Sequence, residues 1–83
     1  MMQKECLKLT ILSPEKTLFS GFATCVSLPG SKAPFVVLRN HAPLISTLTQ
    51  GVISWEGEES GSQDVRGGFV EVKNNEVTAC VEV

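Results

Sequence analysis

One-by-one alternation of apolar and polar residues is the feature that most limits what this chain can fold into. Leu7, Leu9 and Ile11 are separated by Lys8 and Thr10. The same period returns at Val26 and Leu28, at Val70 and Val72, and at Val77, Ala79 and Val81. A two-residue period places alternate side chains on one face of a β-strand. No stretch carries an apolar stripe at helical spacing over three turns, so the chain is predicted to be all-β.

Turn-forming residues separate these segments. Ser13-Pro14, Pro29-Gly30, the Gly-rich stretch 57–62 and Asn74-Asn75 fall between them. Pro presets φ for a turn, whereas Gly and Asn tolerate positive φ. Seven to ten short strands at this spacing predict a β-sandwich or a small barrel. Gly67-Gly68 opens a strand, which indicates a bulge or a close backbone approach rather than a phosphate-binding loop.

The length predicts one domain over residues 1–83. A chain this short needs its side chains for the core, which leaves little room for an enclosed pocket. The N-terminus has no apolar signal core, and no apolar run is long enough to span a bilayer. We therefore expect a soluble protein that reaches a membrane only through a partner. Its basic residues are not clustered and it has no Tyr, so nucleic-acid binding is not expected.

Residues capable of catalysis or metal binding are few. His41 is the only histidine and Asp64 the only aspartate, and nothing in the sequence ties them together. Glu56, Glu58 and Glu59 lack the fixed ligand offsets of a calcium loop, and a solvated hairpin tip explains them better. Neither a catalytic site nor a bound metal or cofactor is expected.

The three cysteines and the single tryptophan have structural explanations. Cys6, Cys25 and Cys80 are widely spaced and form no Cys-x-x-Cys pair. They are interpreted as small apolar side chains in a reducing compartment. Trp55 has alternating neighbours and is interpreted as a partly buried sheet residue rather than a ligand platform.

Several segments, in this order and at this spacing, resemble one family, the epsilon subunit of F-type ATP synthases, which is called delta in mitochondria. The resemblance runs from about residue 6 to 82. Its most specific part is His-Ala-Pro-Leu followed by Gly-Gly-Phe-Val-Glu-Val. The matching segments are 9–15, 19–21, 26–30, 40–44 and 67–72, with Leu48, Gly51, Asn75, Val77 and Thr78.

The resemblance implies a ten-stranded β-sandwich of two antiparallel sheets. It also implies a non-catalytic rotor subunit of the central stalk, which binds the gamma subunit and the c-ring and couples ion-driven rotation to ATP synthesis. Such a subunit lies on the cytoplasmic side of the inner (plasma) membrane of a bacterium and is peripheral through its complex. The driving ion, proton or sodium, is left open.

Two groups of site residues follow from the resemblance. The expected gamma contacts are Ser13, His41, Ala42 and Pro43, with Ser13 and His41 on the same side. The expected c-ring-facing loop holds Ser31, Lys32, Ala33 and Pro34.

That loop departs from the family pattern. Ala33 and Val36 stand at Gly positions, Arg39 stands for Pro, and Lys32 lies where acids are common. Pairing of Lys32 and Arg39 with acidic residues of the ring is our hypothesis for this difference.

The end of the sequence leaves alternatives open. Many family members continue into a helical hairpin that binds ATP and restrains rotation, whereas this sequence ends at Val83. We expect this chain to lack that brake, whether it is naturally short or truncated. The rival interpretations are an unrelated β-sandwich adaptor or small-ligand binding module, which would not co-purify with gamma, and a small enzyme that uses His41.

Overall fold

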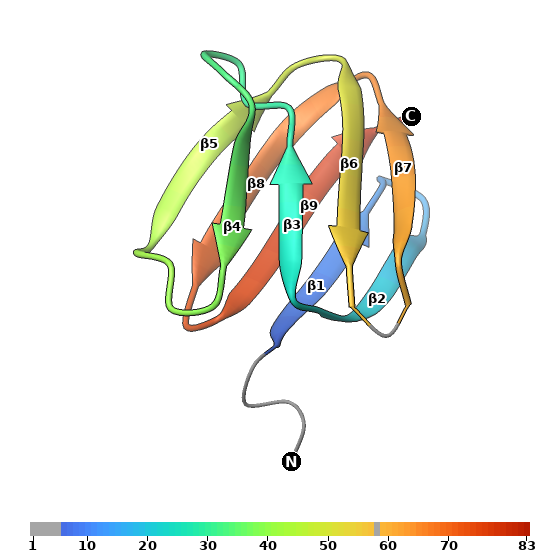
Figure 1. The fold of residues 1–83 in the computed structure, drawn as a ribbon. Coiled ribbons are helices and arrows are strands. Elements are labelled where there is room, and N and C mark those ends of the chain that lie inside the picture. Colours follow the sequence, from blue (N-terminus) through green and yellow to red (C-terminus); the bar gives the residue numbers. More distant parts are fainter. Residues whose placement is uncertain (1–5, 58) are drawn as a thin grey trace.

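The computed structural model describes residues 6–57 and 59–83, which form two facing β-sheets and no helix. One sheet has the strand order β2-β1-β9-β8-β5, and the other has the order β4-β3-β6-β7 (Figure 1). The prediction of an all-β sandwich is confirmed. The strands are β1 (Leu7–Leu12), β2 (Thr17–Ala23), β3 (Cys25–Leu28), β4 (Phe35–Leu38), β5 (Leu44–Leu48), β6 (Gly51–Glu56), β7 (Gly61–Val65), β8 (Gly67–Lys73) and β9 (Glu76–Glu82).

The sheets differ from the expectation in two details. The described residues hold nine strands rather than ten. Between β3 and β4 only Gly30 pairs with another strand, in a single bridge to Leu48, because Pro29 and Pro34 limit ladder formation there. The second difference is that β1 and β9 pair in parallel, although every other ladder is antiparallel. No hairpin joins these two strands, so no turn imposes an antiparallel direction.

One core fills the space between the sheets. The side chains that the alternation predicts to be buried are all buried in the structure. Trp55 is 7% exposed, and its ring lies 4.5 Å from that of Phe19, centroid to centroid. Its interpretation as a sheet residue is therefore confirmed. The core residues are Leu7, Leu9, Ile11, Ala23, Val26, Leu28, Val37, Leu48, Ile53, Trp55, Val65, Val70, Val72, Val77, Ala79 and Val81.

Two turn and strand predictions are confirmed as well. Asn74 and Asn75 have φ angles of 55° and 60° and connect β8 to β9 as a two-residue hairpin. Gly68 has a φ of 144°, and a Cβ atom there would overlap the carbonyl oxygen of Cys80 on β9. Of the Gly-Gly pair, Gly68 therefore serves the predicted close backbone approach. Within the described ranges, no helix is long and apolar enough to cross a membrane.

Candidate partner-binding surface

Ser13 organises the turn between β1 and β2. Its N–H donates to the carbonyl of Lys16 at 2.8 Å. Its hydroxyl donates to the same carbonyl at 3.1 Å and accepts from the Lys16 N–H at 3.2 Å. The Ser13 hydroxyl makes its hydrogen bonds inside the turn and therefore stabilises the shape of this corner. Pro14 and Glu15 are the exposed residues of the turn that a partner could contact.

His41 lies in the loop between β4 and β5. Its N–H donates to the carbonyl of Leu38 at 3.1 Å, and its Nδ1 lies 2.7 Å from the carbonyl of Ala42. A carbonyl oxygen only accepts, so Nδ1 is the donor in this contact. Ala42 and Pro43, which follow, are exposed.

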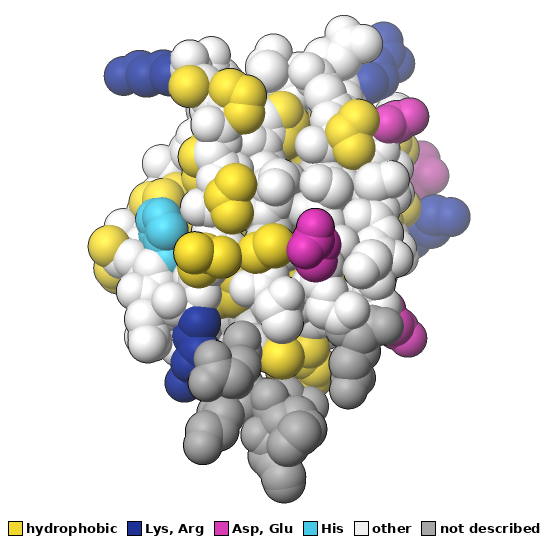
Figure 2. Space-filling model, in the orientation of Figure 1, with side chains coloured by type: hydrophobic (Ala, Val, Ile, Leu, Met, Phe, Trp, Pro, Cys, Tyr) yellow, Lys and Arg dark blue, Asp and Glu magenta, His cyan; other side chains and the backbone are white. Residues whose placement is uncertain are grey.

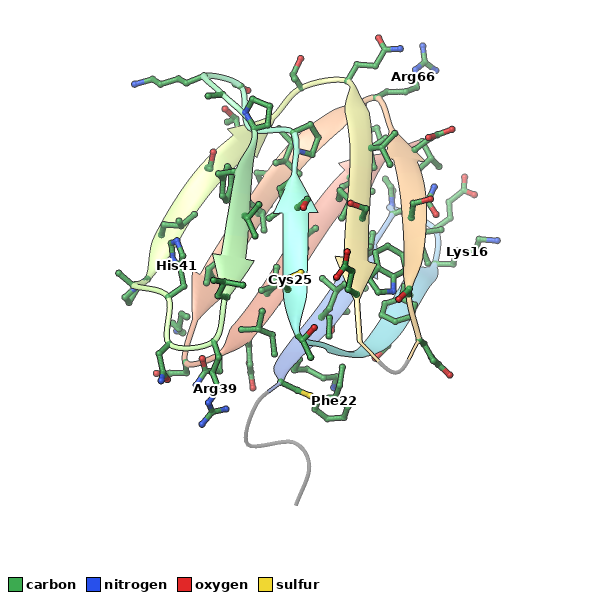
Figure 3. The ribbon with its side chains drawn as sticks, viewed as in Figure 1. Lys16, Phe22, Cys25, Arg39, His41 and Arg66 are labelled. Carbon is green, nitrogen blue, oxygen red and sulfur yellow. The ribbon has the colours of Figure 1, made fainter. Side chains whose placement is uncertain are left out.

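The structure does not bring Ser13 and His41 together. Ser13 follows β1, whereas His41 precedes the edge strand β5, three strand positions away in the same sheet. At the usual strand spacing this is about 14 Å across the sheet. The two residues also lie at opposite ends of their strands. Figure 3 shows His41 on one side of the molecule, while Lys16, the last residue of the Ser13 turn, lies on the other.

The outer face of the five-stranded sheet lies between these two corners. Side chains that alternate with the core residues point outward from it and form rows across the strands. The row next to the Ser13 turn is mostly apolar: Leu12 pairs with Cys80, Cys80 with Phe69, and Phe69 with Thr47. The Phe69 side chain is 50% exposed.

The next two rows become more polar toward the other end of the face. In the second row Glu71 lies between Thr78 and Ile45, whose side chain is 75% exposed. In the third, Glu76 stands opposite both Lys8 and Lys73. The face therefore changes from apolar to charged along the strands.

Two shallow hollows mark opposite corners of this face. One, of about 380 Å³, is lined by Leu12, Phe69 and Cys80 and is bordered by Ser13 and Pro14. The other, of about 340 Å³, is lined by Ile45, Glu71 and Lys73 and is bordered by Pro43. The two predicted gamma segments thus border the same face from opposite corners.

Phe69 and Ile45 were not singled out from the sequence as contact residues. The signal for Phe69 was present, because burial of Val70 and Val72 turns Phe69 and Glu71 outward. Nothing in the sequence indicated that this face would hold the apolar row between the two predicted segments, since that depends on which strands are neighbours.

The loop predicted to face the c-ring lies at the other end of β4 from His41 (Figure 1). It is held against β5, because the Ser31 N–H donates to the carbonyl of Thr47 at 3.1 Å and the Thr47 hydroxyl donates to the Ser31 hydroxyl at 2.9 Å. Residues 31–34 are all exposed. The loop and the His41 segment therefore flank β4, a four-residue strand about 13 Å long.

The opposite face of the sandwich also carries apolar side chains. Figure 2 looks onto the four-stranded sheet and shows His41, the single cyan side chain, at the rim of this face. Val36 on β4 is 50% exposed, the same fraction as Phe69 on the other sheet. In the row across the strands, Cys25 lies between Leu38 and Glu56.

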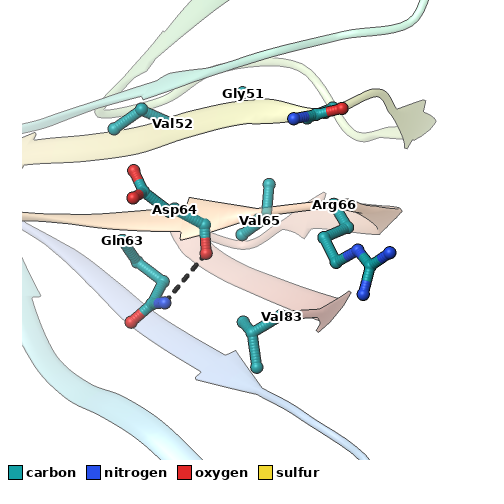
Figure 4. Close-up of a pocket in the computed structure, with 8 residues that line it drawn as sticks. Gly51, Val52, Gln63, Asp64, Val65, Arg66 and Val83 are labelled. Atoms are coloured by element: carbon teal, nitrogen blue, oxygen red, sulfur yellow. Dashed lines mark hydrogen bonds between the residues drawn. The ribbon is translucent and has the colours of Figure 1, made fainter.

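No catalytic or metal-binding arrangement appears among the residues described. Asp64 lies on β7 and His41 follows β4, the two opposite edges of the four-stranded sheet. The hollow beside Asp64 has a volume of about 480 Å³ and is formed by β6, β7, Arg66 and Val83. In it the side-chain amide of Gln63 donates to the backbone carbonyl of Asp64 at 2.9 Å (Figure 4). Residues 6–57 and 59–83 hold no cluster of three metal-binding side chains; Glu58 lies outside them.

Comparison with known proteins identifies the relatives of this fold. The family model described as "ATP synthase, Delta/Epsilon chain, beta-sandwich domain" matches residues 6–83. The ATP synthase epsilon chain of Leptospira interrogans is 41% identical over 78 residues, which cover 93% of this chain and 61% of that protein. The epsilon chain of Caulobacter vibrioides is 36% identical over 77 residues, which cover 92% and 90%.

Solved structures share the fold at low sequence identity. A chain in the Euglena gracilis mitochondrial ATP synthase structure of OSCP, F1 and c-ring superposes with a TM-score of 0.85 and 17% identity, covering 93% of this chain and 51% of that one. A chain in the central stalk and c-ring of the Tetrahymena thermophila mitochondrial enzyme gives 0.78 and 17%, covering 93% and 63%. The present sequence spans 61% of the length of the Leptospira interrogans relative.

Proposed function

The chain belongs to the β-sandwich family of ATP synthase delta and epsilon chains, and from this we propose that it is a non-catalytic rotor subunit of the central stalk. It binds the gamma subunit and the c-ring and so couples ion-driven rotation to ATP synthesis. Residues 1–83 act as a single domain in this role. This role requires a stiff body with a large contact area, and it does not require a catalytic side chain.

The outer face of the five-stranded sheet is the observation that carries the proposal. Ser13 and the segment 41–43 are the proposed gamma contacts, and they border this face from opposite corners. A partner that touches both corners must cover the face between them, including Phe69. A contact of about 800 Å² per partner is wide enough to do so.

The c-ring contact is proposed at the loop 31–34. This loop and the His41 segment lie at opposite ends of β4, and the loop meets the apolar row at Thr47, so the two partners would bind adjacent surfaces. Simultaneous binding is what a subunit that locks a shaft to a ring requires. The bacterial relatives support a location on the cytoplasmic side of the plasma membrane, peripheral through the complex.

Paired substitutions on the two faces test the gamma contact. Phe69→Ser removes an aromatic side chain from the proposed interface, whereas Val36→Ser changes an equally exposed apolar side chain on the opposite face. We expect Phe69→Ser to weaken binding of the gamma subunit by about tenfold or more, as is usual for a buried aromatic contact. Val36→Ser should bind like the unmodified chain.

The measurement is titration of each folded variant with the gamma subunit of the same enzyme, followed by size exclusion of the complex. Equal loss in both variants, or a loss confined to Val36→Ser, contradicts the assignment of the face. An unmodified chain that forms no complex with gamma contradicts the proposed function itself.

A further inference from the structure

Asn75 connects the His41 loop to the turn between β8 and β9 of the five-stranded sheet. Its side-chain oxygen accepts a hydrogen bond from the Asn40 N–H at 2.5 Å, and its side-chain nitrogen donates to the side-chain oxygen of Asn40 at 3.3 Å. These two residues are 35 positions apart in the sequence. The backbone carbonyl of Asn75 accepts in addition from the N–H of Lys8, at the start of β1. Three separate parts of the chain therefore meet at this residue.

The backbone at both ends of this link has an uncommon conformation. Asn40 has a φ of 67° and Asn75 a φ of 60°. Asparagine adopts positive φ more readily than other residues with a side chain. At Asn40 this conformation turns the chain away from β4 immediately before His41. The side chain of Asn75 holds the turn by binding the N–H of the residue that makes it.

We propose that Asn75 is a positioning residue that holds the segment 41–43 in the shape in which it binds its partner. The inference rests on the proposed function, because it takes this segment as part of the gamma contact. The two side-chain hydrogen bonds order a loop before binding, so less conformational entropy is lost when the partner docks. Asn75 itself need not touch the partner.

A matched pair of glycine variants separates this role from a general effect on the hairpin. Asn74 shares the two-residue turn and has a φ of 55°, but its side chain takes no part in the link to Asn40. Asn75→Gly and Asn74→Gly both keep a residue that tolerates positive φ. Asn75→Asp is the conservative variant, since it keeps an acceptor for the Asn40 N–H.

Two measurements on the full chain test the inference. Hydrogen exchange of the Asn40 amide, followed by NMR, reports the link without any partner. We expect faster exchange in Asn75→Gly and near-normal exchange in Asn74→Gly and Asn75→Asp. Titration with the gamma subunit should show affinity weaker by about threefold to tenfold for Asn75→Gly, as expected for the loss of neutral hydrogen bonds. Asn74→Gly should bind normally, and Asn75→Asp should restore most of the affinity.

The outcomes separate the inference from the function on which it rests. If the unmodified chain binds gamma and Asn75→Gly binds equally well, the positioning role is wrong while the proposed function stands. Equal losses in the two glycine variants also overturn it, because the effect then belongs to the hairpin. If the unmodified chain does not bind gamma, the proposed function fails and the positioning role fails with it.

Discussion

Gly68 is the residue at which the backbone leaves least room for a side chain. Its φ of 144° is a conformation that residues with a Cβ atom rarely adopt. A Cβ atom there would also lie 2.8 Å from the Cα of Val81 and would overlap the Cys80 carbonyl. Both contacts are with the backbone of β9, in the middle of the five-stranded sheet, and cannot be relieved by a rotamer change. Its neighbour Gly67 is different, because its nearest contact would be the Leu48 carbonyl oxygen at an ordinary 3.6 Å.

Substitution of the two glycines should therefore have very unequal effects. We expect Gly68→Ala to reduce the free energy of unfolding by about 2–5 kcal/mol, from backbone strain and steric overlap together. Gly67→Ala should cost less than about 1 kcal/mol. Urea denaturation of both variants measures this, and similar midpoints for the two would contradict the role given to Gly68.

At the scale of elements, the loop between β3 and β4 is held more tightly than its exposure indicates. Gly30 at its start is buried, and a Cβ atom there would lie 2.5 Å from the Ala33 carbonyl and 2.9 Å from the ring of Phe35. The hydrogen bonds between Ser31 and Thr47 attach the loop to β5. The backbone that carries Lys32 is thus fixed at the end of the sandwich, which suits a charged contact with a large partner.

Lys32→Glu should weaken attachment to the c-ring, and more strongly at low than at high salt. The physical reason is that an exposed ion pair is screened as ionic strength rises. Lys32→Gln, which removes the charge without reversing it, should lie between the unmodified chain and Lys32→Glu. Binding of the complex with gamma to detergent-solubilised c-ring at several salt concentrations is the measurement. A loss that does not change with salt contradicts pairing with acidic residues of the ring.

On the scale of the whole molecule, both sheets share one core. The radius of gyration is 11.5 Å, close to the roughly 12 Å expected of a compact domain of this length. Core residues from the two sheets form a single cluster, and Trp55 of one sheet packs on Phe19 of the other. By the per-residue rule the stability is on the order of 4–12 kcal/mol. Neither sheet has a core of its own, so both should unfold together.

Unfolding should accordingly be two-state. Trp55 is the only tryptophan, so its fluorescence reports the contact between the sheets, whereas far-UV circular dichroism reports the strands themselves. We expect the two signals to give superimposable urea curves. Separate transitions would show that one sheet survives without the other.

Much of the fold was predictable from the sequence, because the signals that specify it are local. Alternation of apolar and polar residues identified several of the strands and many of the buried positions, such as Leu9, Val70 and Val77. Positive φ at Asn75 and the close approach at Gly68 were predictable from residue type. The family pattern indicated Ser13 and His41 as contacts, and this stays a prediction.

Only the tertiary structure decided which of these parts lie together. The parallel pairing of β1 with β9, the separation of Ser13 from His41 and the link from Asn40 to Asn75 all join positions far apart in the chain. Turn chemistry and strand periodicity act over a few residues, whereas the order of strands in a sheet depends on how the whole chain closes around one core. The sequence alone therefore indicated many of the buried side chains, and the packing of the two sheets determined the rest of the core and which exposed side chains share a surface.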